Sequence, residues 1–481
     1  MSHADLAAEA WAAIGGDPAA ATRLTVTGGT GPGGRAAPLP GPLPTGALAT
    51  ATVGAMLLAA ADLAAARGAG RPEPALDAGH AAVAFTSERH VLLDGHGAGA
   101  PMDPLTAFLP TADGWIRLHA NYPHHRAALM RALGHPRAGA DGVAALVAGR
   151  EAVELESAIV AAGGCAAALR DPLGWRRGEP GTAVAQAGLL DVEPGVPRAT
   201  TTLPALPSGA DPSRPLAGLK VLDLTRVIAG PVATRVLAAL GAQVLRVDAP
   251  LMAELPLPWL DTGPGKRSTH LQLRSRPDRE RLHRLLDDAD VLVAGYRPGA
   301  LDPFGLSHDQ LEEKHPHLCS VTLSAWGETG PWRARRGFDS LVQAATGIAH
   351  VTSLDGGATP GVLPAQALDH GTGYLIAAAA MRALTLRARE GRVSHARVAL
   401  ARTAMWLLAH TPADGLAPDG GAAAAPPAGA VAPPSPAPYL DVLDSPLGQV
   451  TVVRPPGTLG GAALGWATGP AVPGSAAPHW D

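Results

Sequence analysis

Asp369 is the first residue of this sequence that is a candidate for chemistry. It stands in the segment ALDHGTGYLIAAAAMRAL, at the start of a long helix predicted over residues 367–389. The unpaired N–H groups and the dipole of a helix start stabilise an acidic side chain as an anion. Gly371 and Gly373 follow it, and glycines allow a ligand to approach the backbone closely. An ordinary helix-capping aspartate would show the same local pattern.

Four basic residues form a second candidate set. Arg246 and Arg297 stand at the carboxyl ends of two predicted strands, and Lys266 and Arg267 lie in the predicted turn GPGKRS. Ligands of open parallel sheets bind at the carboxyl ends of the strands, so these cations are expected near one site. The turn is not a Walker loop, because Leu260 stands where the first glycine of that motif is required. A solvated basic pair is the alternative interpretation of Lys266 and Arg267.

The elements that must position these residues alternate between strand and helix. Residues 220–224 are mostly apolar, as in a buried strand, and residues 243–247 are the next such run. Between them lies a helix that begins near Pro231 and that Gly241 closes. A strand, a helix and a strand within about thirty residues form a βαβ unit with parallel strands.

The same alternation continues along the chain. It predicts further strands at residues 271–273, 291–294 and 319–323 and further helices at residues 277–287 and 311–315. The predicted fold class is therefore α/β, with an open, mostly parallel, Rossmann-like sheet and helices on both of its faces. A smaller α/β domain is predicted over residues 105–200, with a strand at residues 115–119.

Eight short segments carry a family resemblance. In chain order they are PLAGLKVLDLTRVIAGP, LGAQVLRVD, GKRS, ADVLV, RPGALDPFGL, WGETGPW, RGFD and ALDHGTGYL. Together, from about residue 215 to residue 406, they resemble the class III (CaiB/BaiF, formyl-CoA transferase-like) CoA-transferase family. The resemblance implies an enzyme that exchanges CoA between an acyl-CoA and a carboxylic acid, with coenzyme A as the ligand and no metal.

The resemblance also implies a covalent mechanism at Asp369, which occupies the D-x-x-T-G motif of the family's nucleophile. The carboxylate attacks the acyl-CoA thioester, forms a mixed anhydride and releases the CoA thiolate. The thiolate then converts the anhydride into an aspartyl thioester, from which the acceptor acid takes CoA. Backbone amides at Gly371 and Gly373 would stabilise the tetrahedral oxyanions.

The same resemblance assigns the remaining candidates to CoA binding. It implies that the basic residues clamp the phosphates of CoA and that the turn VIAGP lines the route of the pantetheine arm. These residues are Arg246, Lys266, Arg267 and Arg297 for the phosphates, and Ile228 and Ala229 for the pantetheine arm. The family often has Lys at position 246 and Asn at position 295, where this chain has Arg246 and Gly295.

The order of the predicted elements indicates a rearranged tandem of two related halves. The helix predicted at residues 46–67 and the break after it resemble the helix at residues 367–389 and its own break. The simplest account is a fused pseudo-dimer that lacks one sheet domain and one small domain; a circular rearrangement is the alternative. The predicted parts are residues 1–45 (N-terminal segment and linker), 46–210 (partial repeat with a small lid domain), 211–410 (Rossmann-like CoA-binding domain with the catalytic aspartate), 411–438 (Ala/Gly/Pro-rich linker) and 439–481 (C-terminal return segment).

The first half of the chain, residues 1–210, is expected to supply a lid and not a second active site. No acidic residue occurs from residue 40 to residue 61, where the counterpart of Asp369 would lie. Closure by a lid would exclude water from the reactive intermediates.

The composition of the chain limits the classes of binding partner and the cell compartment that we expect. A net charge of −4 gives no reason to expect nucleic acid or an anionic membrane. Two cysteines, Cys165 and Cys319, argue for a reducing compartment. The longest apolar stretch, residues 46–61, is too short for a membrane span. We therefore expect a cytoplasmic protein that binds an acyl-CoA and a small carboxylic acid, as a homodimer or as a pseudo-dimer within one chain.

Two other functions stay open at this level. An acyl-CoA racemase of the same family uses a histidine before the aspartate of a GHD turn; here residues 337–339 read GFD, and phenylalanine exchanges no proton. A non-catalytic CoA-binding protein or partner subunit would keep the sheet and lose turnover. His119, His124 and His125 lack partners at metal-ligand spacing, so exposed or capping histidines are expected there.

Overall fold

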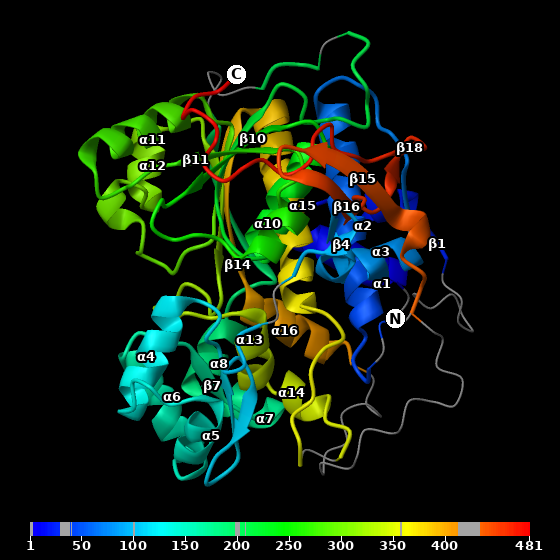
Figure 1. Ribbon diagram of the computed structural model, residues 1–481. Helices are drawn as coiled ribbons and strands as arrows, with labels where there is room; N and C mark the ends of the chain where they lie inside the picture. The colour runs from blue at the N-terminus through cyan, green and yellow to red at the C-terminus, as the bar shows by residue number, and fades with distance from the viewer. Residues whose placement is uncertain are drawn as a thin grey trace.

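A seven-stranded sheet lies at the centre of the computed structural model, which describes residues 3–28, 39, 41–99, 102–197, 203–206, 208–355, 358–411 and 433–481. Its strand order is β11-β10-β9-β12-β13-β14-β8 (Figure 1). Neighbouring strands are parallel, except that β8 runs antiparallel to β14. The strands are β8 (Leu190–Pro197), β9 (Lys220–Leu224), β10 (Gln243–Asp248), β11 (Lys266–His270), β12 (Val291–Ala294), β13 (Cys319–Ser324) and β14 (Arg392–Ala399). The predicted α/β class with a mostly parallel sheet is thus confirmed.

Helices cover both faces of this sheet, and successive strand residues point to opposite faces. Val221 of β9 and Val244 of β10 belong to the core that contains α9 and α15. Their neighbours Leu222 and Leu245 belong to the core that contains α11 and α12. The helices of this part are α9 (Ala229–Ala239), α10 (Pro256–Thr262), α11 (Arg276–Asp288), α12 (His308–Lys314), α13 (Asp339–Thr346), α14 (Ile348–Val351), α15 (Ala367–Glu390) and α16 (Leu400–Ala409), with the 3₁₀ turn η4 (Asp302–Phe304).

One predicted strand is misplaced. β11 spans Lys266–His270, whereas the sequence predicts a turn at GKRS and a strand at residues 271–273. Lys266 pairs with Val244 of β10, and the buried Ser268 and Thr269 continue the strand. A search for apolar runs misses a buried strand that is made of polar residues.

Charged side chains lie on the outer side of α11, whose leucines face the sheet. Leu282 and Leu286 are buried, whereas Arg276 and Glu280 form a 2.8 Å ion pair on the outside.

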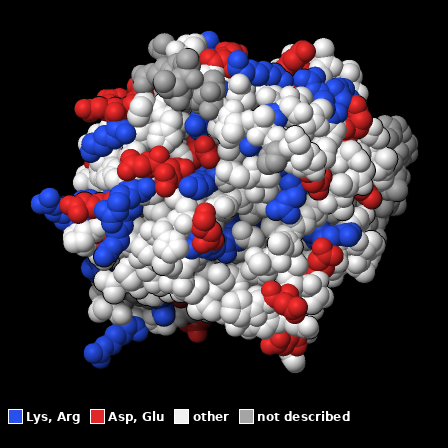
Figure 2. Space-filling view, turned by 90° about the horizontal axis from the view of Figure 1, so that it is seen from above, with Lys and Arg blue, Asp and Glu red and all other residues white. Residues whose placement is uncertain are grey.

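Figure 2 shows one face of the molecule, on which Lys and Arg side chains are interspersed with Asp and Glu side chains. On that face, charges of opposite sign therefore offset one another over short distances.

The first half repeats part of the architecture of the second. β1 (Thr25–Thr27) and β2 (Pro74–Asp77) are parallel and are joined through α2 (Thr45–Ala66), after which α3 (Ala78–Ala84) follows. β13, α15, β14 and α16 show the same order, and β13 is parallel to β14. α2 and α15 lie side by side and pack against each other (Figure 1). The two halves thus share an order of elements, and the internal repeat stays a prediction.

α2 is longer than the apolar stretch suggests. With 22 residues it is long and apolar enough to cross a membrane by length and composition alone. In the structure, 94% of its most apolar window is buried inside the protein. A core helix passes the same test, and the packing of α2 on α15 is that of a core helix.

A small domain follows in the first half and lies at the lower left of Figure 1. It has a core of its own that includes Ile116, Leu129 and Leu155. Its strands β6 and β7 contact α13 of the second half. The elements are β5 (Phe108–Pro110), β6 (Trp115–Leu118), β7 (Ala166–Ala168), α4 (Pro123–Leu133), α5 (Ala140–Ala148), α6 (Ala152–Ala161), α7 (Pro172–Arg177) and α8 (Glu179–Ala185).

The C-terminal segment returns to the first half. β16 pairs with β3, and β17 pairs with β2; the predicted linker at residues 411–438 lies largely outside the described residues. The remaining elements are α1 (His3–Ala13), η1 (Pro18–Arg23), η2 (Ser87–His90), β3 (Leu92–Leu93), β4 (His96–Gly97), η6 (Ala437–Tyr439), β15 (Leu440–Ser445), β16 (Gly448–Val453), β17 (Thr458–Leu459) and β18 (Ala462–Ala463). Two small sheets, β15-β16-β3-β4 and β1-β2-β17-β18, therefore join both ends of the chain.

Candidate active site

Asp369 lies in the first turn of α15 and is 7% exposed. Backbone N–H groups in the first turn of a helix have no partner within the helix. Here Oδ2 of Asp339, the first residue of α13, accepts hydrogen bonds from the N–H groups of Leu368 at 2.9 Å and Asp369 at 3.0 Å. Its other oxygen accepts a hydrogen bond from the side chain of Gln343. The turn that carries the predicted nucleophile is thus fixed to α13.

Asp369 and Asp339 are two carboxyl groups in one buried site. Burial and the charges of Asp339 and Glu88 raise the pKa of Asp369 well above its usual value. Burial raises the pKa of Asp339 to about 6, although its hydrogen bonds act in the opposite direction. Because three donors stabilise the Asp339 anion, we infer that Asp369 is the member of the pair that holds a proton more tightly. Once ionised, Asp369 is a carboxylate of raised basicity, which suits a nucleophile.

Glu88 joins this site from the first half of the chain. It lies in η2, and its Oε2 is 3.1 Å from Nε2 of His370, the residue after Asp369. His370 is 0% exposed. No sequence pattern connects Glu88 with His370, which stand 282 residues apart.

Lys266 is a buried structural cation in this structure, contrary to its predicted role as a phosphate ligand. Its Nζ donates to Oδ2 of Asp223 at 3.1 Å, the carbonyl of Pro231 at 2.9 Å and Oγ1 of Thr234 at 2.6 Å. These bonds use all three donors of the ammonium group. Lys266 is 5% exposed, and burial lowers its pKa to about 8. It therefore ties β11 to β9 and α9.

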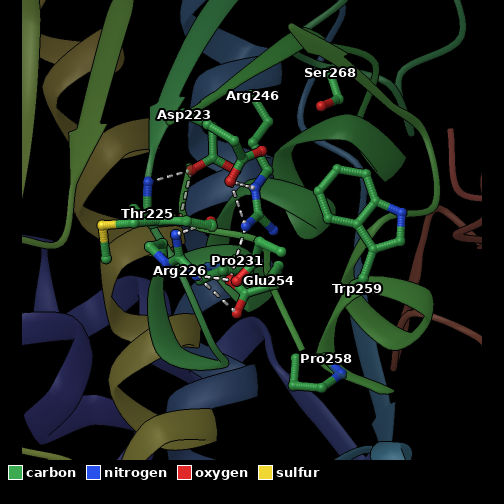
Figure 3. A network of polar contacts seen from close by, with 12 residues as sticks. Asp223, Thr225, Arg226, Pro231, Arg246, Glu254, Pro258, Trp259 and Ser268 are labelled. Atoms are coloured by element: carbon green, nitrogen blue, oxygen red, sulfur yellow. Dashed lines mark hydrogen bonds and ion pairs between the residues drawn. The ribbon is translucent and has the colours of Figure 1, made fainter. Parts of the chain in front are cut away.

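Arg246 also points inward. Its Nη2 donates to Oδ1 of Asp248 at 2.9 Å and to Oε2 of Glu254 at 2.8 Å, as Figure 3 shows for Glu254. Its guanidinium lies 4.7 Å from the centre of the Trp259 ring. Arg246 is 2% exposed. The position at the end of β10 is the predicted one, but two carboxylates already bind the guanidinium.

Glu254 is a site residue that no sequence motif predicts. Its segment, LMAELPLP, matches no motif, yet its carboxylate accepts hydrogen bonds from Tyr122, Val227, Leu255 and Arg246, at 2.6, 3.0, 3.0 and 2.8 Å. Arg226 lies 3.5 Å away as a further cation. Val227 has a φ of 68°, a strained value for a β-branched residue, so Glu254 helps to hold the strained turn after β9. A carboxylate with this many donors occupies a ready-made anion site.

The two other predicted phosphate ligands differ in exposure. Nη1 of Arg267 donates to the carbonyl of His479 at 3.0 Å and pairs with Asp481 at 3.0 Å, so the C-terminal segment engages it. Arg297 is exposed, and its Nη1 donates to the carbonyl of Ala334 at 2.9 Å. Of the four basic candidates, Arg297 is thus the one that the structure leaves open to a ligand.

Gly371 and Gly373 serve helix packing and not oxyanion binding. They are the fifth and seventh residues of α15, so their N–H groups belong to the hydrogen-bond ladder of the helix. A Cβ at Gly371 would meet Leu48 of α2 at 3.3 Å, and one at Gly373 would meet the carbonyl oxygen of Ala229 at 2.6 Å. Glycine therefore lets α15 pack closely on α2 and α9.

Ile228 and Ala229 stand at the start of α9, where the predicted pantetheine route would pass. They are 8% and 3% exposed. Ala229 is also the residue whose carbonyl oxygen approaches Gly373. In this structure both side chains are therefore buried near α15.

His119 and His125 are buried, so the expectation of exposed or capping histidines is wrong for them. His119 stacks on Phe338 with ring centres 3.7 Å apart. The Nδ1 atoms of both histidines have no hydrogen-bond partner in the described part of the chain. Burial lowers the pKa of each to about 3. Among the described residues, no three His, Cys, Asp or Glu side chains gather in a way that would hold a metal ion.

Comparisons with known proteins find a family that is similar to the second half of this chain. Residues 216–436 match the model of CoA-transferase family III. A probable fatty acyl-CoA transferase of Mycobacterium tuberculosis is 34% identical over 214 residues, which cover 42% of this chain and 54% of that protein. Succinyl-CoA:glutarate CoA-transferase of Mus musculus is 32% identical over 199 residues, which cover 38% of this chain and 45% of that protein.

A solved structure gives a match of similar extent. A CaiB/BaiF family protein from Brucella suis is 28% identical and has a TM-score of 0.39, with 49% of this chain and 65% of that chain covered. The chain spans about half the length of the curated relatives that it matches. The matched segment contains Asp369, Asp339 and the βαβ units that position them. Residues 216–436 of this chain are therefore similar to CoA-transferase family III.

Proposed function

We propose that the chain is a CoA-transferase that moves CoA from an acyl-CoA to a carboxylic acid by way of Asp369. The observation that carries the proposal is the buried Asp369 carboxyl in the first turn of α15, which Asp339 holds by two backbone hydrogen bonds. The match of residues 216–436 to the model of CoA-transferase family III supports the reaction class. The cytoplasm is the proposed location, in keeping with the free, buried thiols of Cys165 and Cys319.

The proposed reaction runs through two kinds of acyl–aspartate. The ionised carboxylate of Asp369 attacks the thioester carbon, the C–S bond breaks, and a mixed anhydride and the CoA thiolate form. The thiolate attacks the aspartyl carbonyl of the anhydride, which releases the donor acid and leaves an aspartyl thioester. The acceptor carboxylate then attacks this thioester, and the freed thiolate attacks the acceptor side of the new anhydride. These steps yield the new acyl-CoA and restore the Asp369 carboxylate.

The small domain is the proposed lid of this site. Its strands β6 and β7 contact α13, whose first residue is Asp339. A domain that closes against α13 would exclude water from the anhydride and from the aspartyl thioester. This supports the view that the first half contributes a lid to a single site.

Mass spectrometry after incubation with acyl-CoAs tests the proposal. Donors are succinyl-CoA, acetyl-CoA and formyl-CoA, and acceptors are glutarate, malate and oxalate, which the names of the relatives suggest. We expect transfer with at least one pair, and a hydroxylamine-sensitive CoA adduct on the peptide that contains Asp369. Asp369→Ala should lose both and keep CoA binding. Undiminished transfer by Asp369→Ala would overturn the proposal.

A proton-transfer reaction such as racemisation has less support at this site. Phe338 occupies the place of the histidine, and the imidazole beside it belongs to His119. A base whose pKa lies at about 3 binds a proton too weakly to remove one from a carbon atom near neutral pH. The geometry therefore favours acyl transfer.

A further inference from the structure

η2 of the first half makes a row of contacts with the second half. Oγ of Ser87 donates to Oδ2 of Asp261 at 2.9 Å and accepts from Nη2 of Arg235 at 3.1 Å. Arg89 donates to the carbonyl of Pro364, which stands shortly before α15. Glu88, between Ser87 and Arg89, is thereby anchored on both sides.

The anchored Glu88 reaches the residue next to the proposed nucleophile. Its Oε2 accepts from Nε2 of His370 at 3.1 Å. The imidazole is 0% exposed and stacks on Phe85, with ring centres 5.6 Å apart. Phe85 comes from the first half as well, so the first half surrounds the His370 ring on two sides.

Two carboxylates thus fix the first turn of α15 from different sides. Asp339 holds the backbone N–H groups of Leu368 and Asp369, and Glu88 holds the side chain of His370. We propose that Glu88, contributed by the first half, is a positioning residue for Asp369 and acts through His370. This rests on the proposed function of Asp369 as the nucleophile.

The charge of Glu88 gives the contact a second effect. Burial acts to raise the pKa of Glu88, but the hydrogen bond and the charge of His370 outweigh it, and the pKa lies below its usual value. Glu88 is therefore an anion near neutral pH. The charged groups that act on Asp369 are Asp339 from α13 and Glu88 from η2, and the charges of both raise the pKa of Asp369.

The first half makes a second glutamate–histidine contact, which provides a matched control. Oε2 of Glu9 in α1 lies 2.9 Å from Nε2 of His410, the residue after α16. This pair also joins the two halves, but the Glu9 side chain is 46% exposed. If such glutamate–histidine contacts only join the two halves, loss of either contact should change kcat to a similar extent.

The experiment compares Glu88→Ala, Glu88→Gln and Glu9→Gln in the full chain, with the donor–acceptor pair that wild type turns over fastest. Misplacement of a catalytic group by about 1 Å can cost about 100-fold in rate. We expect Glu88→Ala to lower kcat by about 10- to 100-fold with KM changed less than about twofold. Glu88→Gln keeps a hydrogen-bond acceptor, so its kcat should fall less than that of Glu88→Ala. Its kcat should also begin to rise at lower pH than in wild type, because one charge that raises the pKa of Asp369 is gone. Glu9→Gln should match wild type.

Hydrogen exchange of the amides in residues 367–371 gives a readout without turnover. Faster exchange in Glu88→Ala, with wild-type exchange in Glu9→Gln, is the expected result. If wild type transfers no CoA, the proposed function fails, yet exchange still decides whether Glu88 orders this turn. Wild-type exchange and wild-type kcat in Glu88→Ala, or no change of the pH profile in Glu88→Gln, would overturn the positioning role.

Discussion

Lys266→Met separates two roles for Lys266, as a phosphate ligand or as an interior cation. The side chains of Lys266 and Asp223 are 3% and 0% exposed and form a 3.1 Å ion pair. Removal of the ammonium would leave the Asp223 carboxylate buried without its counter-charge. We therefore expect a loss of stability and not a selective loss of CoA binding.

The magnitude follows from the partners that Asp223 keeps. Breaking a buried ion pair on one side costs about 3–5 kcal/mol. Asp223 would retain hydrogen bonds from the N–H of Thr225, Oγ1 of Thr225 and Oγ1 of Thr234. These bonds offset part of the penalty, so we expect a decrease near the lower end, about 3 kcal/mol, in the free energy of unfolding.

Urea unfolding at pH 7 measures this decrease, and calorimetric titration with CoA measures binding to the folded variant. Lys220→Met is the control. Lys220 lies on β9, the strand of Asp223, and forms a 3.8 Å pair with Asp288 at 27% and 64% exposure, so its loss should cost less than about 1 kcal/mol. The double variant Asp223→Asn/Lys266→Met should recover part of the lost stability, since no unpaired charge remains. A Lys266→Met protein within about 1 kcal/mol of wild type that has lost about tenfold in CoA affinity would show that the phosphate-ligand role is right.

Two further predictions concern Glu254 and His119. Glu254→Gln removes the internal anion from Arg226 and Arg246, so CoA should bind about three- to tenfold more tightly in calorimetric titration. The control Glu156→Gln alters a buried carboxylate that pairs with Arg170 at 2.7 Å and should leave CoA affinity unchanged. An unchanged CoA affinity in Glu254→Gln would mean that Glu254 is purely structural. Because burial depresses the pKa of His119 from 6.5 to about 3, its contribution to stability is lost as the pH falls through that range. His119→Phe can keep the stack on Phe338 and should therefore stay folded at lower pH than wild type, as thermal unfolding from pH 7 to pH 4 would measure. The exposed control His124→Phe should be as sensitive to acid as wild type. Equal acid sensitivity of all three proteins would contradict this prediction.

Local patterns in the sequence suffice for the central strands of the sheet, β9, β10, β12 and β13, and for the nucleophile candidate. β9, α9 and β10 form where the apolar runs and Gly241 predict them, because strands buried on both faces need continuous apolar residues. Asp369 lies in the first turn of α15, as its motif implies. The order strand, helix, strand, helix also recurs in both halves, as the predicted repeat requires.

Tertiary structure alone decided which polar groups are free. Lys266 follows a glycine turn, as an exposed cation would, but parallel pairing with β10 turns its side chain inward to Asp223, 43 residues away. Glu88 and His370 meet across 282 residues, and Glu254 gains Tyr122 from the small domain. Burial of a charge is tolerated only where partners satisfy it, and those partners come from distant segments. A local pattern therefore identifies the residue types of this site, whereas the folded contacts determine which of them can still bind a ligand.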